Sequence, residues 1–272
     1  MDGVSKTAMG VALMRALHRI VDREPYVIDD RVSLRLFGDA ARAWLRSDPS
    51  WATAPQRTAI RGHVLVRSAF AEERLRAAAA RGLRQFVSLG AGYDTFPYRQ
   101  PEWMDGVRVF EVDAPQTQAD KRARLLRGRV PIPSNVTFVP VDFERENLRD
   151  RLADAGLLLD APAFFSWLGV MVYLTRDAAE AVLRFVASFP RGSEIALTFT
   201  PPGEPGTLAR RVAAVGEPLR TRISADDLQS WLRSLGFAAV ALLPAEAALH
   251  YLGHREDVLT ILPGTQIAAA TV

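Results

Sequence analysis

A turn with two glycines offers the clearest chemistry in this chain. Residues Gln85 to Leu89 form a short apolar run, and Gly90 and Gly92 follow it directly, with Asp94 and Thr95 close behind. Glycine allows the turn after a buried strand to bring its backbone close to a small molecule. We therefore expect a ligand beside this turn, although glycine-rich turns also serve as plain structural corners.

The residue at position 95 argues against one class of ligand. A dinucleotide fingerprint, G-x-G-x-x-G, would place a third glycine there, for close helix packing and room beside a pyrophosphate, but this chain has Thr95. A nucleoside ligand without a pyrophosphate is favoured instead. S-adenosylmethionine fits that description because its non-adenosine end is an amino acid. The candidate cofactor-binding residues at this turn are Gly90, Ala91, Gly92 and Asp94.

Acidic residues end the next apolar run, about 20 residues beyond the glycine turn. Its sequence closes on Glu111, Val112 and Asp113. Alternation along a strand puts both carboxylates on one face, and a carboxylate can accept two hydrogen bonds from the vicinal diol of a ribose. We assign Asp113 to the ribose and leave Glu111 open, since an acidic strand end exposed to solvent is the alternative.

The third apolar run ends in a second acid, Asp142, followed by Phe143. The carboxylate could accept a hydrogen bond from an adenine amino group while the ring packs on the base. Asp142 could equally cap a helix that starts near Glu144, and both roles are compatible.

Catalytic groups are harder to assign. The fourth apolar run continues into Phe164 to Leu174, whose end would line the pocket, with Thr175 as the predicted cap of a helix over Arg176 to Ser188. Tyr173 is the catalytic candidate here, although it could be a core residue. The four histidines lie outside the strand-end motifs, and most are expected to be surface or packing residues. His18 is the best candidate for a base because it lies in a presumed helical cap.

Strand and helix patterns alternate after Gly82, which predicts an α/β fold with parallel pairing and right-handed crossovers. Before it, apolar residues recur at helical spacing up to about Ala80. We expect a helical cap over residues 1–81 and a single core over residues 82–272. The final strand is expected to insert antiparallel, because no strong helical period precedes it. The expected strands are Gln85–Leu89, Val107–Val112, Val136–Val141, Ala161–Trp167, Glu194–Phe199, Phe237–Leu243 and Val258–Leu262.

Composition excludes several classes of function. The chain has 272 residues, 49% of them hydrophobic, and no cysteine, so disulfides, thiolate metal sites and thiol nucleophiles are excluded, and no metal site is expected. The net charge of +3 comes from arginines interspersed with acids, which makes nucleic acid a minor possibility. No stretch of about 18 apolar residues occurs, so no membrane partner is expected. We expect a cytoplasmic monomer or homodimer.

Four segments in order, QFVSLGAGYDTFPYR, VFEVDAPQTQADK, VPVDFE and FFSWLGVMVYL, resemble bacterial S-adenosylmethionine-dependent O-methyltransferases related to leucine carboxyl methyltransferase and to polyketide carboxyl methyltransferases. SKTAMGVALMRALH and RGHVLVRSAFAEERL resemble this family too. The resemblance implies a Rossmann-like class I methyltransferase sheet of seven strands, with the last antiparallel. It implies that Arg67 binds the cofactor carboxylate through a bidentate fork. The other cofactor contacts that it implies are Gly90, Asp113, Asp142 and Phe143.

The chain departs from the family at one position. Many relatives have an acid in the fourth-strand segment, written EGxxxYL, where this chain has Leu168 and Gly169 before Tyr173. The cofactor amino group would then use backbone carbonyls near Gly90 or Ser166.

The hypothesis is therefore O-methylation of a small molecule, as in secondary metabolism. A carboxylate acceptor needs no base, because it is ionised at neutral pH, whereas a hydroxyl acceptor would need one. The resemblance favours the carboxylate. The alternatives are a nicotinamide-dependent oxidoreductase and a cofactor-binding scaffold without turnover.

Overall fold

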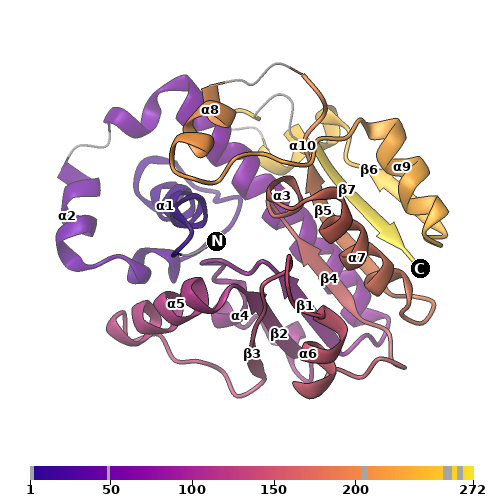
Figure 1. The fold of residues 1–272 in the computed structure, drawn as a ribbon. Helices are drawn as coiled ribbons and strands as arrows, with labels where there is room; N and C mark the ends of the chain where they lie inside the picture. The colour runs from indigo at the N-terminus through magenta and orange to yellow at the C-terminus, as the bar shows by residue number, and fades with distance from the viewer. Residues whose placement is uncertain (1–2, 48–49, 204–206, 254–258, 262–265) are drawn as a thin grey trace.

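Seven strands form one sheet in the order β3-β2-β1-β4-β5-β7-β6 (Figure 1). The computed structural model describes residues 3–47, 50–203, 207–253, 259–261 and 266–272. Strand β7 pairs antiparallel with β5 and β6, and the other neighbours pair in parallel, so the predicted α/β sheet is confirmed. The strands are β1 Gln85–Leu89, β2 Arg108–Asp113, β3 Val136–Pro140, β4 Phe164–Trp167, β5 Glu194–Phe199, β6 Ala239–Leu242 and β7 Gln266–Thr271.

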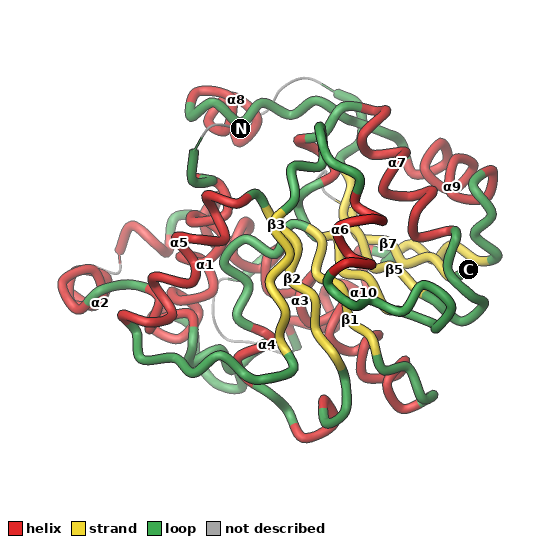
Figure 2. Tube along the Cα trace, turned by 60° about the horizontal axis from the view of Figure 1, so that its bottom comes forward, coloured by secondary structure: helices red, strands yellow, loops and turns green. Residues whose placement is uncertain are grey.

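Helices lie on both sides of the twisted sheet (Figure 2). Figure 1 shows α1 and α2 at one end of the molecule and β6 and β7 at the other. No helix in the described ranges is both long enough and apolar enough to cross a membrane. The helices are α1 Lys6–Val21, α2 Asp39–Ser47, α3 Pro55–Ala80, α4 Phe96–Arg99, α5 Pro115–Arg127, α6 Leu148–Asp154, α7 Arg176–Ala187, α8 Thr207–Ala214, α9 Ala225–Ser234 and α10 Ala245–Leu252, with 3-10 turns η1 Ser33–Leu36, η2 Ser50–Thr53, η3 Glu102–Met104 and η4 Met171–Tyr173.

The position predicted for the last strand is wrong. Val258 and Leu262 lie outside the described residues, and residues 259–261 are not a strand. Strand β7 is instead the alanine-rich segment Gln266–Thr271. It lies between β5 and β6 and is buried on both faces, where Ala268 and Ala269 enter opposite cores. Alanine has a weak strand preference, so tertiary packing rather than local propensity determines this strand.

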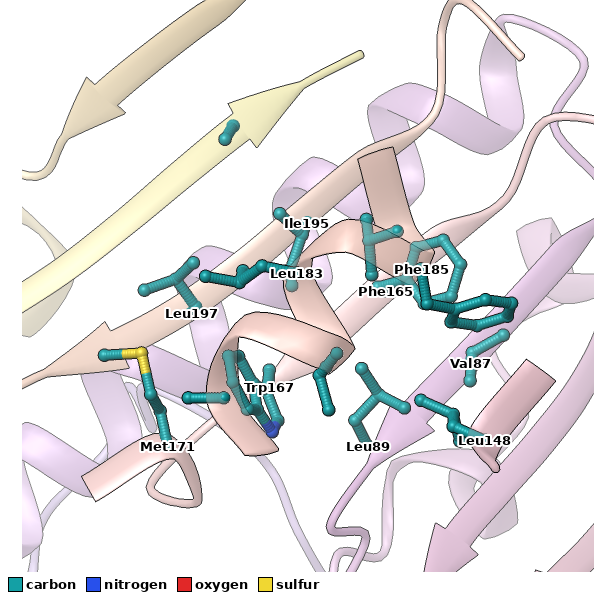
Figure 3. Close-up of a cluster of buried hydrophobic side chains, with 14 of the residues drawn as sticks. Val87, Leu89, Leu148, Phe165, Trp167, Met171, Leu183, Phe185, Ile195 and Leu197 are labelled. Carbon is teal, nitrogen blue, oxygen red and sulfur yellow. The ribbon is translucent and has the colours of Figure 1, made fainter. Parts of the chain in front are cut away.

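Alternate residues of the central strands enter cores on opposite faces of the sheet. One core lies under α6, α7 and α9 and includes Val87, Phe165 and Ile195 (Figure 3). The other lies under α3, α4 and α10 and includes Phe86 and Phe164. Burial on both faces explains why these strands are almost continuously apolar.

The N-terminal helices share these cores with the sheet. Buried residues of α3, such as Phe70 and Ala71, belong to the same cluster as Ala196 of β5 and Ala269 of β7. The expected boundary near Gly82 coincides with the end of α3, directly before β1. Residues 1–81 and 82–272 are therefore packed together closely enough for α3 to position side chains at the edge of the sheet.

The strand order reverses between β1 and β4. The chain runs from β1 outward to β2 and β3, then returns to β4 on the other side of β1. Loops that leave neighbouring strands in opposite directions open a crevice at the carboxyl edge of an α/β sheet, where ligands bind. Gly90 and Gly169 follow β1 and β4 at this point.

Candidate functional site

The glycine turn after β1 is pressed between two other segments. Gly90 and Gly92 adopt φ angles of +68° and +47°, a region that favours glycine. A Cβ atom on Gly90 would overlap the Val170 side chain after β4, and one on Gly92 would lie 3.1 Å from the Cβ of Ala8 in α1. Glycine is therefore required both by the backbone conformation and by the close approach of these neighbours.

Asp113 places a carboxylate directly beside this turn. It accepts hydrogen bonds from the backbone N–H of Gly92 and from that of Ala114, the latter at 2.7 Å. Burial raises the pKa of Asp113, and the two backbone donors oppose that rise. A carboxylate has about four acceptor positions, so this half-buried group keeps capacity for hydroxyl donors.

Glu111 is a structural residue in the described chain. Its two carboxylate oxygens each lie 2.8 Å from Nζ of Lys121, and the Tyr98 hydroxyl donates to it at 2.9 Å. All of these groups are buried. The two acids that end β2 thus have different roles, since Glu111 is enclosed by protein partners and Asp113 faces the turn.

Asp94 connects the turn to the N-terminal helix. It accepts hydrogen bonds from Arg15 Nη1 at 2.5 Å and from the Thr95 N–H at 2.8 Å. Arg15 also donates to Asp30 at 2.9 Å. Burial alone would raise the pKa of Asp94, but the cations of Arg15, Lys121 and Arg99 together outweigh it and hold the pKa below its usual value. The anchored ion pair fixes α1 against the glycine turn.

Arg67 is a cation at the same edge that has no partner in the part of the chain that the structure describes. It lies on α3, and a Cβ atom on Gly169 would be 2.6 Å from its Nη1. It makes no hydrogen bond or ion pair with a described residue, and its Nε is buried. Burial lowers its pKa to about 10. Because buried charges are normally paired, this arrangement favours an anionic ligand.

Tyr173 lies next to Arg67 at the end of η4. Burial raises the pKa of its hydroxyl, while Thr7 of α1 and the Arg67 cation oppose the rise. The start of α1 is held here by Glu217, which accepts from Ser5 Oγ at 3.0 Å and from the Lys6 N–H at 2.7 Å. No pattern in the sequence indicates this contact, which joins segments more than 200 residues apart.

Ser166 and Leu168, at the end of β4, line a small cavity with Asp94 and Ser68. Its volume of about 20 Å³ suits a single water molecule rather than a cofactor. Leu168 packs against the core that α3 covers. Leu168, where the resemblance leads to the expectation of an acid, is therefore part of an apolar wall with polar atoms beside it.

Asp142 and Phe143 follow β3, next to the end of β2, where the Val141 N–H donates to the Asp113 carbonyl at 2.9 Å. The prediction that a helix starts near Glu144 is wrong. Asp142 instead accepts from the Glu144 N–H at 3.0 Å within a turn, and α6 begins at Leu148 with Asn147 as its cap. Phe143 packs on the core under α7. Thr175 does cap α7, as predicted.

His18 has both ring nitrogens engaged by the protein. Nδ1 bonds to Asp22 at 2.8 Å, and Nε2 accepts from the Val27 N–H at 3.0 Å. It is fully buried. The prediction that His18 acts as a base finds no support in this geometry, because neither nitrogen is free to take a proton from a substrate.

His63 is a candidate that the sequence motifs do not identify. It is buried on α3, one turn before Arg67, and neither ring nitrogen has a hydrogen-bond partner among the described residues. Burial, reinforced by the Arg67 cation, lowers its pKa to about 3. The sequence indicates His63 only by its position four residues before Arg67, because residues at this spacing lie on the same face of a helix. In the described ranges, no group of three or more histidine or acidic side chains is placed to hold a metal ion.

Comparisons with known proteins identify relatives of this chain. The family model described as leucine carboxyl methyltransferase matches residues 8–187. A Bacillus subtilis protein, YktD, is 33% identical over 207 residues, which cover 72% of this chain and 68% of YktD. A Streptomyces coelicolor protein is 33% identical over 258 residues, 92% of this chain and 88% of the relative. Both are named "Putative S-adenosyl-L-methionine-dependent methyltransferase".

One solved structure extends the comparison to the whole fold. A DUF574 family protein from Streptomyces avermitilis superposes with a TM-score of 0.57 over 98% of this chain and 97% of its own. Its sequence identity of 18% makes this a likeness of fold alone.

Proposed function

The chain belongs to the leucine carboxyl methyltransferase family, and we propose that this S-adenosylmethionine-dependent methyltransferase transfers its methyl group to the carboxylate oxygen of a small molecule. The observation that carries the proposal is the Arg67 cation, which lies against Gly169 after β4 and has no partner among the described residues. A ligand that is anionic at one end and carries a ribose fits an edge that offers Arg67 and Asp113 together.

The residues present fit each part of the cofactor. Arg67 would hold its carboxylate through a bidentate fork. Asp113 would accept hydrogen bonds from the ribose hydroxyls, and Asp142 with Phe143 would bind the adenine. For the amino group, Asp94 and Ser166, which line the same small cavity, would supply side-chain oxygens. These assignments use the turn, the neighbouring strand ends and α3, all of which meet at the same edge.

The protein's contribution would be to position the acceptor and exclude water, because bound S-adenosylmethionine itself supplies a methyl carbon activated by positive sulfur. Orientation of reactants contributes roughly 7–11 kcal/mol in favourable cases. Tyr173 stays protonated at neutral pH, since its pKa is raised, so its hydroxyl can donate a hydrogen bond to an acceptor oxygen.

A carboxylate acceptor fits these groups better than a hydroxyl. A hydroxyl must lose a proton, but His18 is engaged on both nitrogens and His63 has a pKa of only about 3. A carboxylate is already ionised and needs donors only.

Calorimetric titration with S-adenosylhomocysteine tests the cofactor, with NAD⁺ as the matched control. We expect saturable binding of S-adenosylhomocysteine and none of NAD⁺, and the reverse would establish the oxidoreductase alternative. Release of S-adenosylhomocysteine from S-adenosylmethionine across a panel of carboxylic acids and phenols then tests turnover. Turnover confined to phenols would contradict the carboxylate proposal, and binding without turnover would favour a scaffold.

A further inference from the structure

His63 is deeply buried, yet its ring has no hydrogen-bond partner within the described residues. The residue is only 4% exposed, and both ring nitrogens lack a hydrogen bond among the described residues. Buried polar groups in folded proteins nearly always have a hydrogen-bond partner, because a buried donor or acceptor without one costs about 1–3 kcal/mol. A bound ligand would supply the hydrogen-bond partner that the His63 ring lacks.

The direction of His63 follows from its neighbours on α3. Arg61 bonds to Asp22, which caps the end of α1, and Gly62 faces the Thr260 carbonyl, which a Cβ atom at position 62 would overlap. His63 follows these two residues, and the spacing of four places it on the helix face that Arg67 occupies. The Arg67 cation is close enough to lower the pKa of His63. His63 therefore lies on the helix face that carries the proposed cofactor subsite.

The chemistry of His63 at this position is that of a donor. A neutral imidazole carries one N–H donor and one acceptor nitrogen. Protonation would place a second cation beside Arg67 in a buried environment, which makes proton abstraction unfavourable. The N–H remains available to an acceptor oxygen. Its hydrogen bond to an ionised carboxylate would be stronger than one to a neutral oxygen.

We propose that His63 donates a hydrogen bond to the carboxylate of the methyl acceptor and holds that group beside the subsite at Arg67. This inference rests on the proposed function. His63 is then a residue that binds and selects the acceptor and does not remove a proton from it.

Two-dimensional NMR of the imidazole rings tests the contact directly. The protein loaded with S-adenosylhomocysteine is titrated with benzoate and hexanoate, and with methyl benzoate as the uncharged control. We expect the carboxylates to shift the His63 ring signals while those of His18 and the exposed His250 stay in place. Methyl benzoate is expected to leave all of them unchanged.

Two variants separate hydrogen bonding from packing. His63→Phe is expected to weaken binding of the carboxylate that shifts the ring signals by about tenfold or more, the loss of one hydrogen bond to a charged group. His63→Gln, which keeps a donor, is expected to recover part of that loss. Both variants should bind S-adenosylhomocysteine within about twofold of the unaltered protein, because Arg67 is intact.

Failure has distinct forms. If no carboxylate shifts the His63 signals, or if His63→Phe binds the carboxylate as well as the unaltered protein does, the inference is overturned. If the unaltered protein does not bind S-adenosylhomocysteine, the proposed function fails instead. Should His63→Phe not fold, the ring signals of the unaltered protein and the His63→Gln affinity decide the question.

Discussion

Helix α3 carries two arginines with opposite environments six residues apart. Arg61 is fully bonded, with Nε and Nη2 at 2.6 and 2.8 Å from the Asp22 carboxylate and Nη1 at 2.9 Å from the Ala52 carbonyl. The same carboxylate bonds to His18. Arg67, one and two-thirds turns further on, has no partner among the described residues, and neither has the nearby His63.

The two arginines show that hydrogen bonding, rather than residue type, distinguishes a structural ion pair from a candidate ligand site. Both arginines lie on α3, and each has a histidine nearby. His18 bonds to the same carboxylate as Arg61, and His63 is close enough to Arg67 for the cation to lower its pKa. The network at Arg61 is complete without a ligand and holds α1 against α3. The network at Arg67 is open, and an anion would complete it.

The largest expected effect is on the stability of the closed network. Arg61→Leu leaves the Asp22 carboxylate buried without its cation, so we expect the free energy of unfolding to fall by about 3–5 kcal/mol. Urea denaturation followed by circular dichroism measures the change. Arg67→Leu is the matched control, and its unfolding free energy should stay within about 1 kcal/mol of the unaltered protein. Equal losses in both variants would remove the distinction between the two arginines.

The next effect is on ligand binding at the open network. Arg67→Leu is expected to weaken S-adenosylhomocysteine binding about 100-fold, which corresponds to about 2.7 kcal/mol, in the range for removing a buried charged partner. Calorimetry measures the dissociation constant. Arg67→Lys keeps the charge but not the fork and should give an intermediate value. An unchanged affinity in Arg67→Leu would place the cofactor carboxylate elsewhere.

A smaller effect extends the comparison to the two acids of β2. Asp113→Asn should weaken S-adenosylhomocysteine binding about tenfold, because an amide offers a single, neutral acceptor oxygen to the ribose hydroxyls. Glu111→Gln is the control, since Glu111 is enclosed by Lys121 and Tyr98, and the folded variant should bind with unchanged affinity. A larger loss of affinity in Glu111→Gln than in Asp113→Asn would reverse the assignment.

The smallest effect is a pH dependence at His63. Its pKa is about 3 in the folded protein, against an ordinary value of 6.5 for the unfolded chain. Between these values the unfolded chain binds more protons, so the folded state loses stability as the pH falls. The His63→Phe variant does not show this loss. As the pH falls from about 7.5 to 5.5, we therefore expect the unfolding free energy of the variant minus that of the unaltered protein to rise by about 1 kcal/mol. Urea denaturation at the two pH values measures the difference, and parallel stability curves would show that His63 is not held neutral.

Local patterns predicted the parts of this structure that local residues determine. The apolar run into Gly90 and the acid at Asp113 identified the strand ends that face the crevice, because glycine conformation and strand alternation act over a few residues. The resemblance added Arg67. The roles of these residues in binding stay predictions.

Long-range packing determined what the sequence could not predict. Strand β7 is alanine-rich because it lies between two strands under close-packed cores, so its pattern resembles no isolated strand. The bonds of Arg61 to Asp22 and of Ser5 to Glu217 join residues 39 and 212 positions apart. Only the fold shows that, of these two arginines of α3, Arg61 is paired and Arg67 has no partner among the described residues.

The most direct test of the central claim is a crystal structure of the protein with S-adenosylhomocysteine bound. We predict the ligand at the carboxyl edge of β1 and β4, with its carboxylate on the Arg67 guanidinium and its ribose hydroxyls on Asp113. A ligand elsewhere on the protein, or one at this edge whose carboxylate leaves Arg67 without a partner, would contradict this claim.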